Sequence, residues 1–144
     1  MNIPTHFYRK LTLVCYLLLL VWVPVWHLFL ANPTGRSQQF EIILTLAWTI
    51  PLLLPFIGII KGKPYTHAWA NFIVMFYLIH GFTSIYAVAD EWFFALIEIV
   101  LSTGMFIGCS FYARKRGKEL GLGIPKLKDE MAKEKATFES QLKE

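Results

Sequence analysis

Apolar residues fall in four long runs along the chain, and short polar segments separate these runs. Each run holds roughly 20 mostly apolar residues, the length that an α-helix needs to cross the hydrocarbon core of a bilayer. We place the spans at about residues 11–31, 42–60, 68–88 and 92–113. Because the connections are short, consecutive helices should be antiparallel neighbours. The pattern predicts an all-α protein, an integral membrane four-helix bundle.

Composition agrees with a membrane protein. The chain of 144 residues is 56% hydrophobic and 17% charged, and its mean hydropathy is +0.48. A soluble domain of this size cannot bury so much apolar surface, whereas lipid tolerates it. The first run is about twice as long as a signal-peptide core, and no small-residue cleavage site follows it, so we interpret it as a retained span. The net charge of +4 is distributed beside the apolar runs. This distribution favours the lipid bilayer over nucleic acid as a partner.

Basic residues lie almost entirely on one side of the predicted bundle. Eight of them flank the spans on that side: Arg9, Lys10, Lys61, Lys63, Arg114, Lys115, Arg116 and Lys118. The other side has Arg36 alone, near the level where Trp26, Tyr86 and Trp92 would form an outer aromatic belt. Since basic loops remain in the cytoplasm, the predicted topology is N-in/C-in. We divide the chain into a four-span domain at 1–118 and a short, charged, cytoplasmic helical tail at 119–144.

The second span contains two prolines, Pro51 and Pro55. Each removes a backbone donor and leaves a carbonyl without its helical partner. Broken helices of this kind coordinate ions in some transporters, but most are plain kinks. We expect a kink, with the hydroxyls of Thr45 and Thr49 available to the freed carbonyls.

Glu98 is the only carboxylate well inside a span, and a charged side chain at that depth costs roughly 2.5–3.5 kcal/mol. It should therefore face the bundle and find a partner. His80 lies ten residues before the turn at Asp90 and Glu98 eight after it, which places the two at depths that differ by about 3 Å. Ser84 and Ser102 lie one helical turn from His80 and Glu98, and His27 near the outer end of the first span could join them.

Two interpretations of this buried polar site remain open. It could handle a proton or another cation, or it could be a polar clasp that holds two helices together. We favour the clasp, because one Glu–His pair is short of a transport pathway. Ligation of a b-type haem by His27 and His80 is a third, weaker interpretation. No metal or cofactor is predicted from the spacing of the Cys, His and acidic residues.

Two further features concern packing and contact. Gly104 and Gly108 form a GxxxG pattern in the fourth span, which allows close helix approach within the monomer or in a homodimer, and we favour the monomer. The loop between the second and third spans is a candidate cytoplasmic interface, together with the basic residues after the fourth span. Thr66 is a plausible N-cap of the third span. The candidate interface comprises Lys61, Lys63, Pro64, Tyr65, Thr66, His67, Trp69, Arg114, Lys115 and Arg116.

Two segments carry a family resemblance. Residues 62–81 (GKPYTHAWANFIVMFYLIHG) and 92–114 (WFFALIEIVLSTGMFIGCSFYAR) resemble the small bacterial membrane proteins grouped as domain of unknown function 2069. The resemblance covers about residues 10–116, and its PYTHAW and Tyr-x-x-His-Gly elements are fairly specific. It implies a multi-pass protein of the bacterial inner membrane, and it supplies no activity, ligand or catalytic residue.

Three functions follow as hypotheses. No soluble-enzyme motif is present, so the leading one is a non-enzymatic membrane protein that works by contact, as a scaffold, assembly factor or accessory subunit. Its partner would be another membrane protein or a second copy. The second is a small proton- or cation-coupled transporter that uses Glu98 and His80. The third is an intramembrane cofactor-binding protein.

Overall fold

The computed structural model describes residues 4–31, 37–122 and 127–141, and nearly all of these are helical. The elements are α1 (Thr5–Val25), the π-helix η1 (Trp26–Leu30), α2 (Gln38–Leu53), α3 (Phe56–Ile60), α4 (Pro64–Ala87), the 3₁₀ helix η2 (Ala89–Glu91), α5 (Trp92–Glu119) and α6 (Leu127–Gln141). Four stretches are long and apolar enough to cross a membrane: Thr5–Leu30, Gln38–Ile60, Pro64–Ala87 and Ala89–Glu119. For the described residues, the prediction of an all-helical fold is confirmed, and so is the prediction of four helical stretches long and apolar enough to span a membrane.

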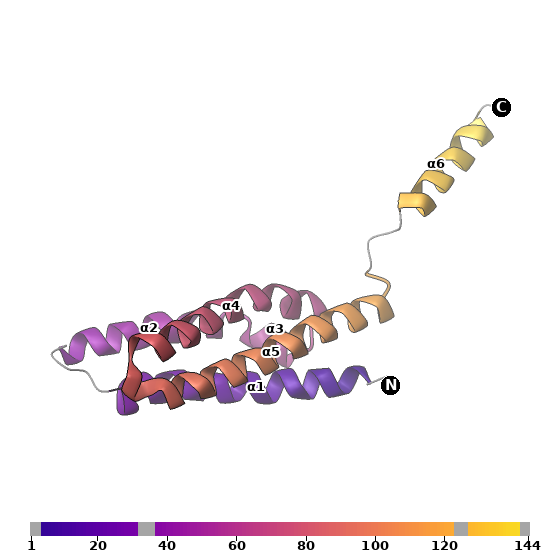
Figure 1. Ribbon diagram of the computed structural model, residues 1–144. Coiled ribbons are helices and arrows are strands. Elements are labelled where there is room, and N and C mark those ends of the chain that lie inside the picture. The colour runs from indigo at the N-terminus through magenta and orange to yellow at the C-terminus, as the bar shows by residue number, and fades with distance from the viewer. Residues whose placement is uncertain (1–3, 32–36, 123–126, 142–144) are drawn as a thin grey trace.

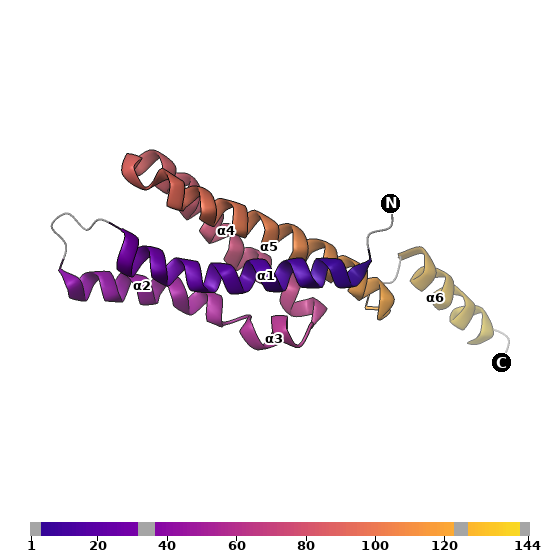
Figure 2. The same ribbon diagram turned by 90° about the horizontal axis from the view of Figure 1, so that it is seen from below.

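The four spans are packed unequally. Helix α5 runs along both α1 and α4, whereas α2 lies mainly against α1 and η1 and touches α4 at few points. The start of α1, the α3–α4 turn and the end of α5 lie at the same end of the bundle (Figures 1 and 2). We call this the terminal end, and we call the end with η1 and η2 the distal end. The molecule is thus a core of α1, α4 and α5 with α2 at its edge.

Small residues allow α5 to lie close to its two neighbours. A Cβ atom on Gly108 would lie 2.4 Å from Oγ1 and 3.0 Å from the backbone nitrogen of Thr12 on α1. A Cβ atom on Gly104 would lie 2.7 Å from Sγ of Cys15. The structure therefore places both glycines of the GxxxG pattern inside the monomer, against α1. Tight packing of this kind is a main source of helix association in lipid.

The second span is not one helix, because it breaks between Leu53 and Phe56 at Pro55. Two buried tyrosines from neighbouring helices supply donors there. The Tyr16 hydroxyl of α1 donates to the Leu52 carbonyl, and the Tyr77 hydroxyl of α4 donates to the Trp48 carbonyl.

The two threonines of this span act elsewhere than expected. Thr45 donates to the Glu41 carbonyl and Thr49 to the Thr45 carbonyl, both one turn back in α2. The break is a kink, as expected, but the side-chain donors beside it come from α1 and α4, and they bond the Trp48 and Leu52 carbonyls, each one residue after a carbonyl that a proline frees. This follows from helix geometry, because a threonine hydroxyl in a helix reaches back one turn and cannot reach forward to the break.

The turn between α3 and α4 is built around Gly62. Its φ of +68° is a left-handed conformation that suits glycine. The Gly62 amide donates to the Ile59 carbonyl and the Lys63 amide to the Gly58 carbonyl, which is a Schellman motif.

The prediction that Thr66 caps the third span is wrong. Lys63 is the N-cap and Pro64 the first residue of α4, while Thr66 lies inside the first turn with its side chain against Gly58. A proline at the first helical position needs no amide partner, so the helix begins earlier than the polar residue suggested.

Helix α6 extends away from the bundle (Figure 1), and its side chains from Met131 to Gln141 are exposed. A charged helix with no buried face is stable only through its own short-range contacts. Arg36, used above for the predicted topology, lies outside the described residues.

Candidate functional site

The strongest candidate site lies toward the distal end, where α4 meets α5. Glu98 is fully buried on α5, and its Oε2 lies 2.8 Å from Nδ1 of His80 on α4. Gly81 lets the helices approach here, because a Cβ at this position would lie 2.7 Å from the side chain of Ile99. The structure thus brings into contact His80 and Glu98, the two residues that the sequence predicted to lie at similar depths in the bundle.

Aromatic rings from two other spans enclose the His80 imidazole. The ring centroid of Trp48 on α2 lies 4.2 Å from that of His80, and those of Trp26 and His27 on η1 lie 5.5 and 5.3 Å away. All four spans therefore contribute to one cluster, which we call the distal polar cluster: Trp26, His27, Trp48, His80 and Glu98.

The π-helix η1 aims two adjacent residues into this cluster. A π-helix widens the turn by one residue and is frequent at functional sites. Trp26 and His27 stack on each other, with ring planes 14° apart, and His27 also stacks on Trp48 with planes 7° apart. Trp26 is 1% exposed and its indole donates to Glu91 Oε2 at 3.0 Å. Trp26 was expected in an outer aromatic belt with its polar tip in water, but its ring is buried in the bundle, and the half-buried carboxylate of Glu91 in the η2 turn accepts the hydrogen bond of its N–H.

A cavity of about 450 Å³ adjoins the cluster between η1 and the start of α2. His27 and Glu41 supply its ionisable groups, and the rest of its lining is Leu28, Phe29, Ala31, Gln38 and Ile42. Glu41 is itself 9% exposed. His27 is thus the member of the cluster that faces both the cavity and the His80 ring.

The predicted extension of the pair through serine hydroxyls is not seen among the described residues. Ser102 is buried one turn from Glu98, yet its hydroxyl has no hydrogen-bond partner there, and neither has Glu98 Oε1. Ser84 lies half-buried one turn from His80 and is not bonded to it. The pair is therefore joined by a single contact.

This geometry suits an imidazole that exchanges a proton with a carboxyl group. A carboxylate in a low-dielectric interior is costly unless it is paired, and the Nδ1–Oε2 contact supplies the pairing for one oxygen. The indole faces of Trp26 and Trp48 would also stabilise a positively charged imidazole ring. The same contact holds α4 against α5, so it is compatible with the clasp and with proton chemistry.

The arrangement does not suit bis-histidine haem ligation. The rings of His27 and His80 are in contact, with centroids 5.3 Å apart and planes 54° apart. This leaves no space between the two imidazoles for a planar macrocycle. Among residues 4–31, 37–122 and 127–141, no group of three or more His, Cys, Asp or Glu side chains could hold a metal ion.

The candidate cytoplasmic interface divides into an inward and an outward part. His67 is fully buried and its Nδ1 lies 2.8 Å from the Lys63 carbonyl, while its ring lies 4.4 Å from that of Tyr112 on α5. The Tyr112 hydroxyl donates to the Gly62 carbonyl at 2.8 Å, and Arg9 donates to the Ile60 carbonyl at 3.1 Å. These contacts fasten the α3–α4 turn to α1 and α5.

The outward part consists of residues that point away from the bundle. Lys61, Lys63, Tyr65 and Arg114 are exposed, whereas Pro64, Trp69, Lys115 and Arg116 are half-buried. Lys115 lies over the Tyr8 ring at 5.2 Å, and Arg116 pairs with Glu119 at 2.9 Å.

Sequence reasoning missed Trp48, Glu91 and Tyr77 as contributors to the site. Trp48 carried a usable signal, since an indole in the middle of a span lies far from the interfaces that tryptophan favours. Glu91 and Tyr77 carried none, because both sit at ordinary positions for their residue types.

Comparison with known proteins gives a family and no function. No curated protein and no solved structure matches this chain. A family described as a predicted membrane protein (DUF2069) matches residues 11–117, which include most or all of each of the four spans and every member of the distal polar cluster. The chain belongs to this family of predicted membrane proteins.

Proposed function

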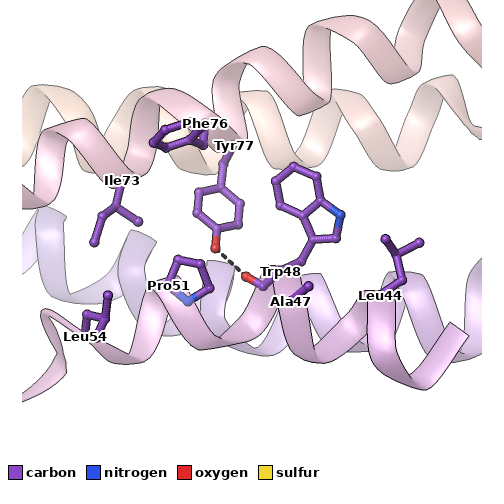
Figure 3. A pocket seen from close by; sticks show the side chains of 8 residues that line it. All are labelled: Leu44, Ala47, Trp48, Pro51, Leu54, Ile73, Phe76 and Tyr77. Carbon is purple, nitrogen blue, oxygen red and sulfur yellow. Dashed lines mark hydrogen bonds between the residues drawn. The ribbon is translucent and has the colours of Figure 1, made fainter. Parts of the chain in front are cut away.

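We propose that this chain is a non-enzymatic protein of the bacterial inner membrane, with both termini in the cytoplasm, that works by contact as an accessory, assembly or scaffold subunit. The observation that carries the proposal is a lateral groove between α2 and α4 (Figure 3). The groove has a volume of about 570 Å³, and the described part of the chain leaves it unfilled.

The groove is apolar. Its lining is Leu44, Ala47, Trp48, Pro51, Leu54, Ile73, Phe76 and Tyr77. The Tyr77 hydroxyl already donates to the Trp48 carbonyl (Figure 3). The lining on α2, from Leu44 to Pro51, extends over about 10 Å of helix axis, close to two turns, and Leu54 continues it at the break after α2. A groove of this length matches the face of a helix that runs alongside it.

The occupant we propose is a transmembrane helix of a partner protein. In lipid, helices associate through van der Waals packing, so a hollow between two helices is filled best by side chains that fit it. A second copy of this chain is the weaker choice, because its small-residue faces at Gly104 and Gly108 are already used against α1. The exposed Lys61, Lys63 and Tyr65 lie at the terminal end, where they would meet anionic headgroups or the partner's cytoplasmic part.

Site-specific photo-crosslinking in intact cells tests the proposal. A photoreactive amino acid replaces Ala47 or Phe76 in the groove, and the matched controls are Leu18 on α1 and Val100 on α5. The controls are lipid-facing positions that are 52% and 62% exposed, against 65% for Phe76.

A discrete adduct with one other membrane protein is expected from the groove positions and not from the controls. An adduct with the mass of two copies would overturn the choice of occupant, because it would show that the groove binds a second copy of this chain. Lipid adducts alone, or the same products from all four positions, would contradict a contact function for this groove.

A further inference from the structure

The distal polar cluster carries chemistry that a contact protein does not need. A clasp between α4 and α5 requires one hydrogen bond, which any buried pair of neutral polar residues could supply. Here the carboxyl group of Glu98 and the imidazole of His80 form that bond. The indole rings of Trp26 and Trp48 lie beside this imidazole, and a second imidazole, that of His27, lines the adjoining cavity. We infer that Glu98 and His80 form a proton-binding site that is loaded from the distal surface through His27.

The contact between His80 Nδ1 and Glu98 Oε2 is where the proton is held. At a distance of 2.8 Å one hydrogen lies between the two atoms, and it can be covalently bonded to either of them. If His80 is neutral and donates from Nδ1, Glu98 is a carboxylate and the pair has a charge of −1. Addition of one proton makes the pair neutral overall, either as an ion pair or as a carboxylic acid beside a neutral imidazole.

The loading step balances in a simple way. A proton arriving at the free ring nitrogen of His80, Nε2, forms an N–H bond there. The hydrogen on Nδ1 then passes to Oε2 of Glu98, so the Nδ1–H bond breaks and an O–H bond forms. The imidazole ends in its other neutral tautomer, and the net change is the uptake of one proton from water. No oxidant, reductant or metal is required.

The ionisable groups in the distal polar cluster and next to it, other than His80 itself, lie on four elements. Glu98 lies on α5, Glu91 on η2, His27 on η1, and Glu41 on α2 across the cavity from His27. Toward the terminal end, the next polar side chain beside the cluster is the buried Tyr77, which packs on the Trp48 ring and whose hydroxyl is engaged with the Trp48 carbonyl. Proton entry is therefore expected from the distal cavity, with His27 between water and His80.

Infrared difference spectroscopy on the full chain in lipid nanodiscs tests the site. Spectra are compared across about pH 5 to 8, the range in which imidazole groups titrate. The wild type should show a carbonyl-stretch band of a protonated carboxyl group that grows as the pH falls. Glu98→Gln should remove this band, and Glu119→Gln should keep it, because Glu119 is an exposed carboxyl group at the terminal end.

A second measurement keeps the inference testable if Glu98→Gln does not fold. In ¹⁵N-histidine NMR of the wild type, the ring signals that disappear in His80→Gln should shift over the same pH range. A band that persists in folded Glu98→Gln, or a wild type with no pH-dependent change in either spectrum, would reduce the pair to a clasp with fixed protonation.

The route is tested separately from the site. After a pH jump on oriented proteoliposomes, the Glu98 band should respond faster from the distal face than from the terminal face. His27→Phe should keep the band and slow its response by on the order of tenfold, because it removes a proton-transfer group and keeps a ring of similar size. Equal responses from both faces, or no slowing in His27→Phe, would overturn the route through His27. None of these results depends on a partner in the α2–α4 groove.

Discussion

Replacement of Gly108 by alanine should push α1 and α5 apart. The new Cβ would lie 2.4 Å from Thr12 Oγ1, 3.0 Å from its backbone nitrogen and 3.3 Å from its Cα. Two of these atoms are backbone, so the rotation of one side chain cannot relieve the overlap. Strain from an overpacked interface costs about 1–3 kcal/mol. Alanine recovers up to about 1 kcal/mol of helix propensity, which leaves a net loss of about 1 kcal/mol.

Gly117→Ala is the matched control, because it lies on the same helix with no atom within 4 Å of the new Cβ. It should gain up to about 1 kcal/mol. Gly104→Ala should behave between the two, since its new Cβ would meet only Sγ of Cys15 closely, at 2.7 Å. The added change Cys15→Ala should restore Gly104→Ala fully, whereas Thr12→Ala should restore Gly108→Ala only in part.

Reversible unfolding by SDS in mixed micelles, followed by tryptophan fluorescence, measures these differences. The order of unfolding free energies should be Gly117→Ala, then wild type and Gly104→Ala, then Gly108→Ala. Equal stability of the Gly108 and Gly117 variants would refute the packing of α5 on α1. Full rescue of Gly108→Ala by Thr12→Ala would show that the backbone contact is not limiting.

Three further outcomes are expected in the same unfolding assay. Tyr77→Phe removes the hydroxyl donor to the Trp48 carbonyl and should cost about 1 kcal/mol; an unchanged free energy of unfolding would mean that the carbonyl finds another donor. Gly62→Ala and Gly121→Ala each force a residue with φ of +68° to carry a side chain and should each lose about 1 kcal/mol. Gly62→Ala should lose more, because its Cβ would also lie 3.0 Å from the Tyr112 hydroxyl, and equal losses would contradict this contact. Ending the chain after Leu122 should leave stability unchanged, because the described side chains of α6 are exposed, and a measurable loss would reveal a contact between α6 and the bundle.

The four spans were predictable because each is a local property of the chain. A run of about 20 apolar residues must satisfy its backbone hydrogen bonds internally in lipid, which makes it a helix wherever its neighbours lie. The kink at Pro55 was predictable for the same reason, since proline removes a donor in any context. The beginning of α4 was not predicted correctly, because Thr66 and Pro64, two residues apart, offered competing start signals.

The sequence could predict the depth of the candidate site residues along their helices, but not the direction in which their side chains point. Similar spacing from a tight turn, ten residues against eight, gave His80 and Glu98 similar depths, and their contact at 2.8 Å is the arrangement this suggested. The face of each helix could not be deduced, because the spans are apolar on all sides and have almost no polar stripe to orient them. Ser84 and Ser102 therefore looked like natural extensions of the pair, although neither is bonded to it.

Sequence alone determined what must be true of each span by itself: its helical state, its length, and which buried polar residues need partners. Only the tertiary structure decided which helices touch. It packs Gly104 and Gly108 against α1, leaves α2 at the edge with an open groove beside α4, and turns Trp26 inward to Glu91. The physical reason is that lipid is as apolar as the spans it surrounds, so hydrophobicity inserts each helix but does not choose its neighbours. That choice comes from close packing and single hydrogen bonds, which depend on atoms far apart in the chain.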